Sequence, residues 1–175
     1  MAFTAQPGAE YNVIGSFNDF FNTQVTAKGL PAFMPSAVVN FDFPQSPITF
    51  PSFSVNHLGS DPNPIAQGNN LDDGWRGYER IGIAEISVWE SYQRASGQHW
   101  RNVRIMRDMA ARVFGTGAAI PILDVYGTTG TPTANGTIIR AMGVTDTPVP
   151  QEPNPDILRI RMTVEYNWLE RISAG

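Results

Sequence analysis

Residues 79–114, ERIGIAEISVWESYQRASGQHWRNVRIMRDMAARVF, decide the fold of this chain. The first part, residues 80–92, is predicted to be one strand, which at 3.3 Å per residue spans about 40 Å. Both faces of this strand are apolar, with Ile81, Ile83 and Trp89 on one and Ala84, Ile86 and Val88 on the other. Such a strand usually lies in a sheet covered on both sides, so we expect one cover from a helix and one from another chain or layer. Its length predicts that it projects past its own core.

The second part is predicted to be an amphipathic helix over residues 98–114. The apolar residues recur at intervals of three and four: Trp100, Val103, Met106 or Arg107, Ala110, Val113 and Phe114. Ser96 fits the N-cap position, and Gly115 and Gly117 follow the last apolar residue, where a left-handed residue is expected to end the helix. The opposite face is mainly basic and carries Arg101, Arg104, Arg107, Asp108 and Arg112.

Length and composition indicate one domain over residues 1–175 with a real core. The chain is 42% hydrophobic, and its net charge of −4 argues against a large basic footprint for nucleic acid. The absence of cysteine excludes disulfides and thiolate chemistry. No run of about 18 apolar residues occurs, and the amino terminus lacks a signal-peptide pattern, so we expect a soluble protein with no membrane contact. Only Lys28 is a lysine among the twelve basic residues, and arginine is the cation favoured at protein interfaces.

The remaining elements follow from periodicity and turn residues. A helix is expected over residues 10–25, and strands over 37–43, 48–57, 121–126, 137–142 and 158–168. The first two strands are predicted to form a hairpin-like pair, in which Pro51 makes the second an edge or bulged strand. Long loops are expected at 58–77, 127–136 and 143–156. The predicted fold class is therefore α+β, with a mostly antiparallel sheet and two main helices packed on one face.

No arrangement of side chains predicts a reaction. His57 and His99 lack the spacing of a metal site or a catalytic base, and no nucleophile or phosphate-loop motif occurs. Asp61, Asp72 and Asp73 could bind a hard cation, but a solvated acidic loop fits them better, because the EF-hand pattern is missing. We therefore predict no catalytic, cofactor or metal site, and a protein that is not an enzyme.

Charged residues on the central strand and the second helix are the candidate interface residues. Glu79 and Glu85 share a face with apolar side chains, which an arginine partner or a subunit boundary would explain better than catalysis would. The helix arginines fit a solvated face, a phosphate contact or a protein interface. The residues predicted to lie at an interface are Arg101, Arg104, Arg107, Arg112, Glu79, Glu85, Asp72, Asp73 and Trp75.

Three segments carry a resemblance to a known family. The strand IAEISVWESY (83–92), the helix HWRNVRIMRDMAARVFG (99–115) and the closing strand LRIRMTVEYNWLERI (158–172) follow an amphipathic helix and a strand pair. This order resembles the tail terminator proteins of long-tailed phages and related tail-like particles, over most of the chain. The long loop at 58–77 and the proline-rich stretch before the last strand look like insertions, so the resemblance assigns them no role.

The resemblance implies a structural virion protein assembled in the host cytoplasm. Tail terminators form a hexameric ring that caps the tail tube, stops its polymerisation and joins the tail to the neck or head-completion protein. DNA passes through the ring without specific binding, which suits an acidic chain. The alternatives are another ring-forming part, namely a tail-tube subunit or a head–tail joining protein, and, from another class, a small α+β hydrolase or ligand-binding protein that uses Glu85 or His99.

Overall fold

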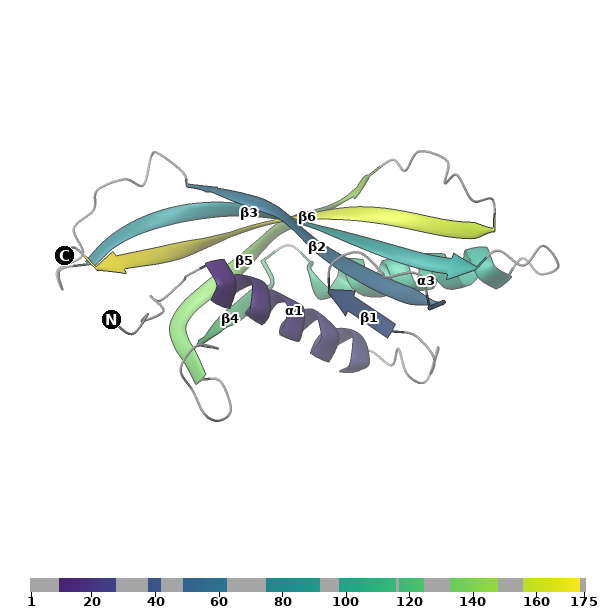
Figure 1. The fold of residues 1–175 in the computed structure, drawn as a ribbon, viewed down its shortest axis with the longest axis horizontal. Coiled ribbons are helices and arrows are strands. Elements are labelled where there is room, and N and C mark those ends of the chain that lie inside the picture. The colour runs from purple at the N-terminus through teal and green to yellow at the C-terminus, as the bar shows by residue number, and fades with distance from the viewer. Residues whose placement is uncertain are drawn as a thin grey trace.

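The computed structural model describes residues 10–27, 38–41, 49–62, 75–91, 98–115, 117–124, 133–147 and 156–173. The helices in this part are α1 (Glu10–Ala27) and α3 (Gln98–Val113), and its strands are β1 (Val38–Phe41), β2 (Ser52–Pro62), β3 (Trp75–Ser91), β4 (Ala119–Asp124), β5 (Thr133–Thr147) and β6 (Ile157–Ser173). The strands form one curled sheet in the order β1-β2-β3-β6-β5-β4. Both helices lie against the same face of this sheet (Figure 1), which confirms the predicted α+β class.

The centre of the sheet is the antiparallel pair β3 and β6, which are in register from Trp75↔Ser173 to Ser91↔Ile157. β2 flanks β3 and β5 flanks β6, both antiparallel. At one end, residues 75–79 and 169–173 pair only with each other among the described residues, because β2 and β5 no longer reach them. The two strands therefore project as a ribbon past the rest of the sheet (Figure 1), in agreement with the predicted projection.

The predicted hairpin between residues 37–43 and 48–57 is wrong. β1 pairs with β2 in the parallel direction, from Val38↔Ser52 to Phe41↔Val55. Pro44, Pro47 and Pro51 lack an N–H and cannot donate to a ladder, so pairing of the second run begins only at Ser52, after all three prolines. Ten residues then separate the strands, and a separation of this order permits the crossover that parallel strands need.

The three predicted loops were too long. Residues 58–62 and 75–77 belong to β2 and β3, and residues 133–136 and 143–147 belong to β5. Residues 63–74, 127–132 and 148–155 of these loops lie outside the described residues. Glycine, asparagine and aspartate have low strand propensity, but pairing with β3, β4 or β6 outweighs that preference. A bulge between His57 and Gly59, whose φ is 122°, lets β2 continue past the predicted end of the strand.

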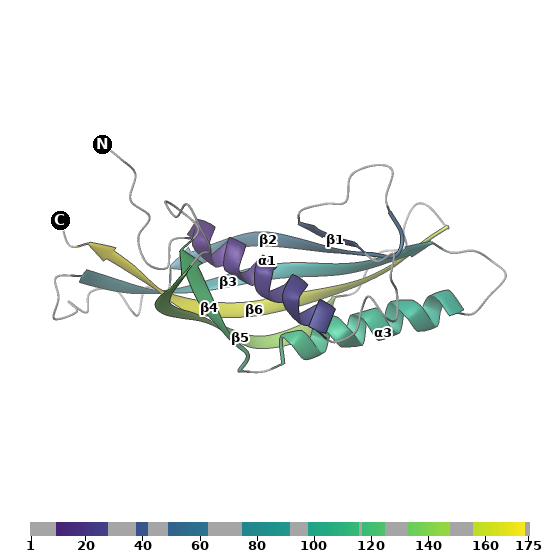
Figure 2. The ribbon, with the colours of Figure 1, turned by 90° about the horizontal axis from the view of Figure 1, so that it is seen from below.

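The core lies between the sheet and the two helices. α1 contributes four fully buried residues at helical spacing, Val13, Phe17, Phe21 and Val25. The Phe17 ring stacks on Phe114, just after α3, with centroids 4.5 Å apart. β5 bends so that β4 lies on the other side of α1 (Figure 2), where the Leu123 amide donates a 2.8 Å hydrogen bond to Ser16. The curled sheet thus holds α1 from two sides.

α3 differs from its predicted pattern at two positions. Met106 is fully buried, so the methionine and not Arg107 faces the core. Trp100, predicted on the apolar face, is 46% exposed. The first turn of α3 lies at the end of the sheet and beyond α1 (Figure 2), so α1 does not cover this indole.

A close cross-strand contact ties α1 to the sheet. Tyr166 of β6 faces Gly82 of β3, and its hydroxyl hydrogen-bonds to Nδ1 of His57 at 3.0 Å. Nε2 of His57 reaches Oδ1 of Asn18 in α1 at 3.1 Å. A Cβ at residue 82 would stand 2.5 Å from Cζ of Tyr166, so only glycine leaves room for the phenol ring.

We predict that Gly82→Ala lowers the free energy of unfolding by about 1–3 kcal/mol, because the buried Tyr166 ring must move against its neighbours. Urea denaturation measures the change. Gly143→Ala is the matched control in β5, since a Cβ there meets nothing within 4 Å. If both substitutions changed the free energy of unfolding equally, the Tyr166 ring would be able to move aside without cost, which would contradict this prediction.

Candidate functional site

The second face of the sheet is open in the part of the chain that the structure describes. No helix of the described chain packs on it (Figure 1), and it carries the odd-numbered side chains of β3 and β6. Ile83 is 40% exposed and Leu169 is 37% exposed on this face. The expected helix cover is therefore present on one side of β3, and within the described residues the second cover is missing. This open face is the candidate site.

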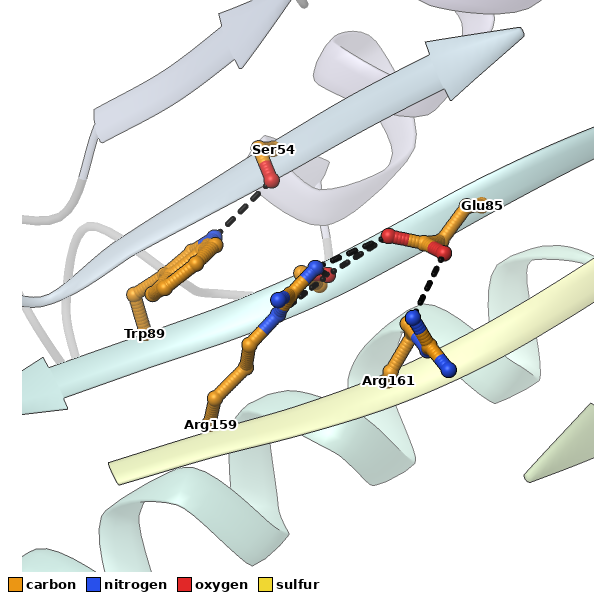
Figure 3. Close-up of polar contacts among 6 residues, drawn as sticks. Ser54, Glu85, Trp89, Arg159 and Arg161 are labelled. Carbon is orange, nitrogen blue, oxygen red and sulfur yellow. Dashed lines mark hydrogen bonds and ion pairs between the residues drawn. The ribbon is translucent and has the colours of Figure 1, made fainter. Parts of the chain in front are cut away.

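One half of the open face is closed by its own polar side chains (Figure 3). Trp89 of β3 is only 7% exposed, because the guanidinium of Arg159 lies over its ring, 4.3 Å from the centroid. The indole Nε1 donates a 2.8 Å hydrogen bond to Oγ of Ser54 in β2. A large aromatic side chain thus stays on the helix-free face with both its ring and its N–H engaged.

Glu85 is the centre of this polar half. Nη2 of Arg159 donates to Oε1 of Glu85 at 2.9 Å, and Nη1 of Arg161 lies 3.4 Å from Oε2 (Figure 3). The hydroxyl of Ser87 adds a 3.3 Å hydrogen bond to Oε1. The arginine partner predicted for Glu85 is therefore present, and there are two of them. Two guanidinium groups share one carboxylate, so this group of three side chains carries a net charge of +1.

The arrangement fits binding better than catalysis. Both oxygens of Glu85 are occupied by arginine, so neither is free to contact a substrate. His99, the other residue considered for an enzyme, lies on the helix side, with Nδ1 3.9 Å from Glu90. The sheet separates the two residues. In the described part of the chain, no group of three or more His, Asp and Glu side chains could hold a metal, and no helix is long and apolar enough to span a membrane.

Four more residues were predicted to lie at an interface, and the structure describes two of them, Glu79 and Trp75. Glu79 accepts a 2.9 Å hydrogen bond from Nδ2 of Asn167, across the β3–β6 pair. The backbone of Trp75 begins β3 opposite Ser173. Asp72 and Asp73 lie outside the described residues.

The predicted arginine face of α3 divides into two kinds of residue. Arg101, Arg104 and Arg112 are exposed. Arg107 instead donates to both carboxylate oxygens of Asp146 in β5, at 2.9 and 2.7 Å, and to Asp108 at 2.8 Å. The hydrogen bonds to Asp108 and then Asp146 raise the pKa of Arg107 above its ordinary value. Arg107 therefore fastens α3 to the sheet and is not available to a partner.

Sequence reasoning missed three members of the polar half, Trp89, Arg159 and Arg161, as functional candidates. The available signal was a glutamate on an apolar face of one strand and an Arg-x-Arg pair on another. Which strand lies beside β3 is decided by the sheet order, and this order places Ser87 opposite Arg161 and Trp89 opposite Arg159.

Comparisons with known proteins give structural similarity without a family. No family model matches the sequence, and no curated protein matches it significantly. A solved chain from the virion of a native gene transfer agent particle is 16% identical, with a TM-score of 0.47 over 90% of this chain and 96% of that chain. A second solved chain is 10% identical, with a TM-score of 0.47 over 90% and 95%. TM-scores below 0.5 at such identities assign no function, which has to follow from this chain's own residues.

We predict that Glu85→Gln lowers the free energy of unfolding by roughly 1–3 kcal/mol, because two guanidinium groups lose their shared charge partner. The matched control is Glu165→Gln, an exposed glutamate on the same face of the sheet. Thermal or urea unfolding compares the two. If Glu85→Gln lowered the free energy of unfolding no more than Glu165→Gln does, the ion pairs of Arg159 and Arg161 with Glu85 would contribute nothing to stability.

We predict that Arg107→Gln costs about 0.5–1 kcal/mol of stability, because it removes a forked ion pair that is partly exposed. Arg104→Gln should stay within about 0.5 kcal/mol of the parent, as substitutions at exposed positions usually do. The same unfolding measurement tests both. Equal stabilities would contradict the role of Arg107 in fastening α3 to β5.

Proposed function

We propose that this chain is a structural subunit of a phage-type tail, and specifically a tail terminator. In this role the protein forms a ring at the head-proximal end of the tail, caps the tail tube and joins it to the neck. The observation that carries the proposal is the open face of the sheet, where Ile83 and Leu169 remain exposed beside the projecting ribbon of β3 and β6.

The apolar part of the open face supports a contact between subunits. Ile83 and Leu169 lie on long strands whose opposite face is already buried by helices. The Glu85 group keeps its neighbouring half rigid, because each of its charged side chains is held by another. A preorganised surface of this kind loses little conformational freedom on binding.

The projecting ribbon supplies a second element for assembly. Residues 75–79 and 169–173 each have one ladder edge without a partner among the described residues. Such edges can accept a strand from another chain. A contact that joins different surfaces of successive copies is heterologous, and such contacts close into rings when the rotation per subunit permits it.

The resemblance of the sequence adds the more specific parts of the proposal. It implies a hexamer, a tail-tube protein on one side of the ring and a neck or head-completion protein on the other. Net acidity supports the passage of DNA, because a chain of charge −4 would not retain phosphates strongly.

A substitution at the open face tests the proposal. We predict that Ile83→Glu leaves the monomer folded, because this side chain is 40% exposed, and that it abolishes the ring. Asn22→Glu on the exposed side of α1 is the control and should assemble normally. Native mass spectrometry and electron microscopy, with purified tail-tube protein present, measure ring formation and tube length.

The outcomes separate the terminator from its rivals. A terminator forms single rings and fixes tube length when it is added to polymerising tube protein. Polymerisation of this chain by itself into tubes would instead identify a tube subunit. A protein that stays monomeric in the presence of tube protein and leaves tube length unchanged would refute the proposal.

A further inference from the structure

A groove of ≈ 180 Å³ lies between α1 and β4. For comparison, a cavity of about 150 Å³ is large enough to bind a benzene ring. Apolar side chains of both elements and two polar side chains of α1 line the groove: Phe20, Ile120, Pro121, Leu123, Asp19 and Thr23. Asp19 is exposed and has no ion pair with any described residue. The groove therefore fits an aromatic ring that is accompanied by a positive charge.

The first two turns of α3 present such a combination. Trp100 is 46% exposed, whereas Trp89 and Trp168 are buried. Arg101 and Arg104 are exposed, and neither has an ion pair within the described part of the chain. Arg104 follows Trp100 by four residues, so the two side chains are neighbours on the helix surface. Tryptophan and arginine are the residues most enriched in binding hot spots, so this end of α3 has the composition of a contact surface.

The end of α3 cannot reach the groove of its own chain. Phe20, in the groove, lies beside Phe114 just after the carboxyl end of α3, with ring centroids 6.3 Å apart. Trp100 and Val113 are 13 residues apart in α3, which is about 20 Å at 1.5 Å per residue. α3 also begins at the end of the sheet that is far from β4 (Figure 2). The groove of another copy is therefore the one that Trp100 can enter.

We propose that Trp100 of one copy inserts into the α1–β4 groove of a neighbouring copy, where Arg104 pairs with the neighbour's Asp19. Both charges lack an ion pair among the described residues of one chain, and opposite charges across a contact fix its register. The helix end and the groove are different surfaces, so the contact is heterologous, as a closed ring requires. The inference rests on the proposed function, because it assigns one subunit contact of the proposed ring.

Removal of the indole tests the apolar part of the contact. Trp100→Ala should weaken self-association roughly thirtyfold, which is the effect typical of a hot-spot residue. Phe41→Ala is the matched control, because it removes an aromatic ring of similar exposure, 43%, from β1 and should leave association unchanged. Analytical ultracentrifugation measures association, and urea unfolding verifies that both variants are folded. Equal association of the two variants would overturn the inference.

Charge exchange tests the polar part of the contact. Asp19→Arg and Arg104→Asp should each weaken association at least roughly tenfold, because each brings like charges together. A chain that carries both changes should regain association, since the contact again joins opposite charges. Arg112→Asp is the control at the other end of α3, and Asp19→Arg should not regain association when it is combined with this change. Failure of the Asp19→Arg, Arg104→Asp chain to recover would overturn the inference.

Cysteine crosslinking tests the proximity directly, because the parent chain has no cysteine. A chain with Thr23→Cys, in the groove, is mixed with a chain with Arg104→Cys under the conditions that give rings, and a short bifunctional maleimide is added. We expect a crosslinked dimer of the two chains. Arg112→Cys lies about 12 Å farther along α3 and should give at least roughly tenfold less of this dimer. Equal yields from Arg104→Cys and Arg112→Cys would contradict the contact.

The outcomes keep this inference separate from the proposed function. Rings that form and cap tubes whatever the residues at 19, 100 and 104 would overturn the contact and leave the terminator role intact. Association that depends on these residues, without any effect on tube length, would support the contact and refute the terminator role. Binding of a labelled DNA duplex that is lost in Arg104→Asp, with no crosslink to Thr23→Cys, would assign this end of α3 to phosphate and overturn the inference.

Discussion

The antiparallel pairing of β3 with β6 is the interaction on which the rest of the structure depends. It joins 17 residues of each strand without a bulge. β2 and β5 pair directly with these two strands, and β1 and β4 are attached through β2 and β5. Because side chains alternate along both strands, their register assigns Ala84, Ile86 and Val88 to the helix side together with Met162, Val164 and Tyr166. A shift of one residue would exchange this apolar set with Glu85, Arg159 and Arg161. The hydrophobic core and the polar group therefore enforce the same register.

The two faces of this pair are stabilised by different physical effects. On the helix side, apolar burial dominates, and the aromatic side chains of α1 contact Phe114 and the sheet. On the open side, long side chains cover one another, since Arg159 shields Trp89 and also binds Glu85. This polar half needs no second layer to remain ordered, whereas the exposed Ile83 and Leu169 beside it gain from one. The difference places the proposed subunit contact at the apolar part of the face and gives the polar part a positioning role.

Several elements could be predicted because their signals are local. The helix at 98–113 follows from apolar residues at intervals of three and four, and the strand at 157–173 follows from alternation. The strand at 75–91 follows from an extended run that is apolar on both faces. The bounds of β2, β3 and β5 were underestimated, because Gly59, Gly77 and Gly143 suggest turns locally while pairing with neighbouring strands keeps these residues in the sheet. The direction of β1 was wrong for a related reason. Short strands separated by prolines suggest a hairpin, but the return path of the chain decides whether they run parallel.

The sequence by itself determined the α+β composition, the two amphipathic helices, the long strands and the oddity of Glu85 on an apolar face. These properties depend on periodicity and on the cost of burying charge, which act on neighbouring residues. Only the tertiary structure decided that Arg159 and Arg161 bind Glu85, and that Arg107 binds Asp146 while Arg104 stays exposed. It also decided that no helix of the described chain covers the second face of the sheet. These facts depend on the sheet order and on the direction in which each helix packs. Both are set by contacts between residues 39 to 76 positions apart, which no local pattern encodes.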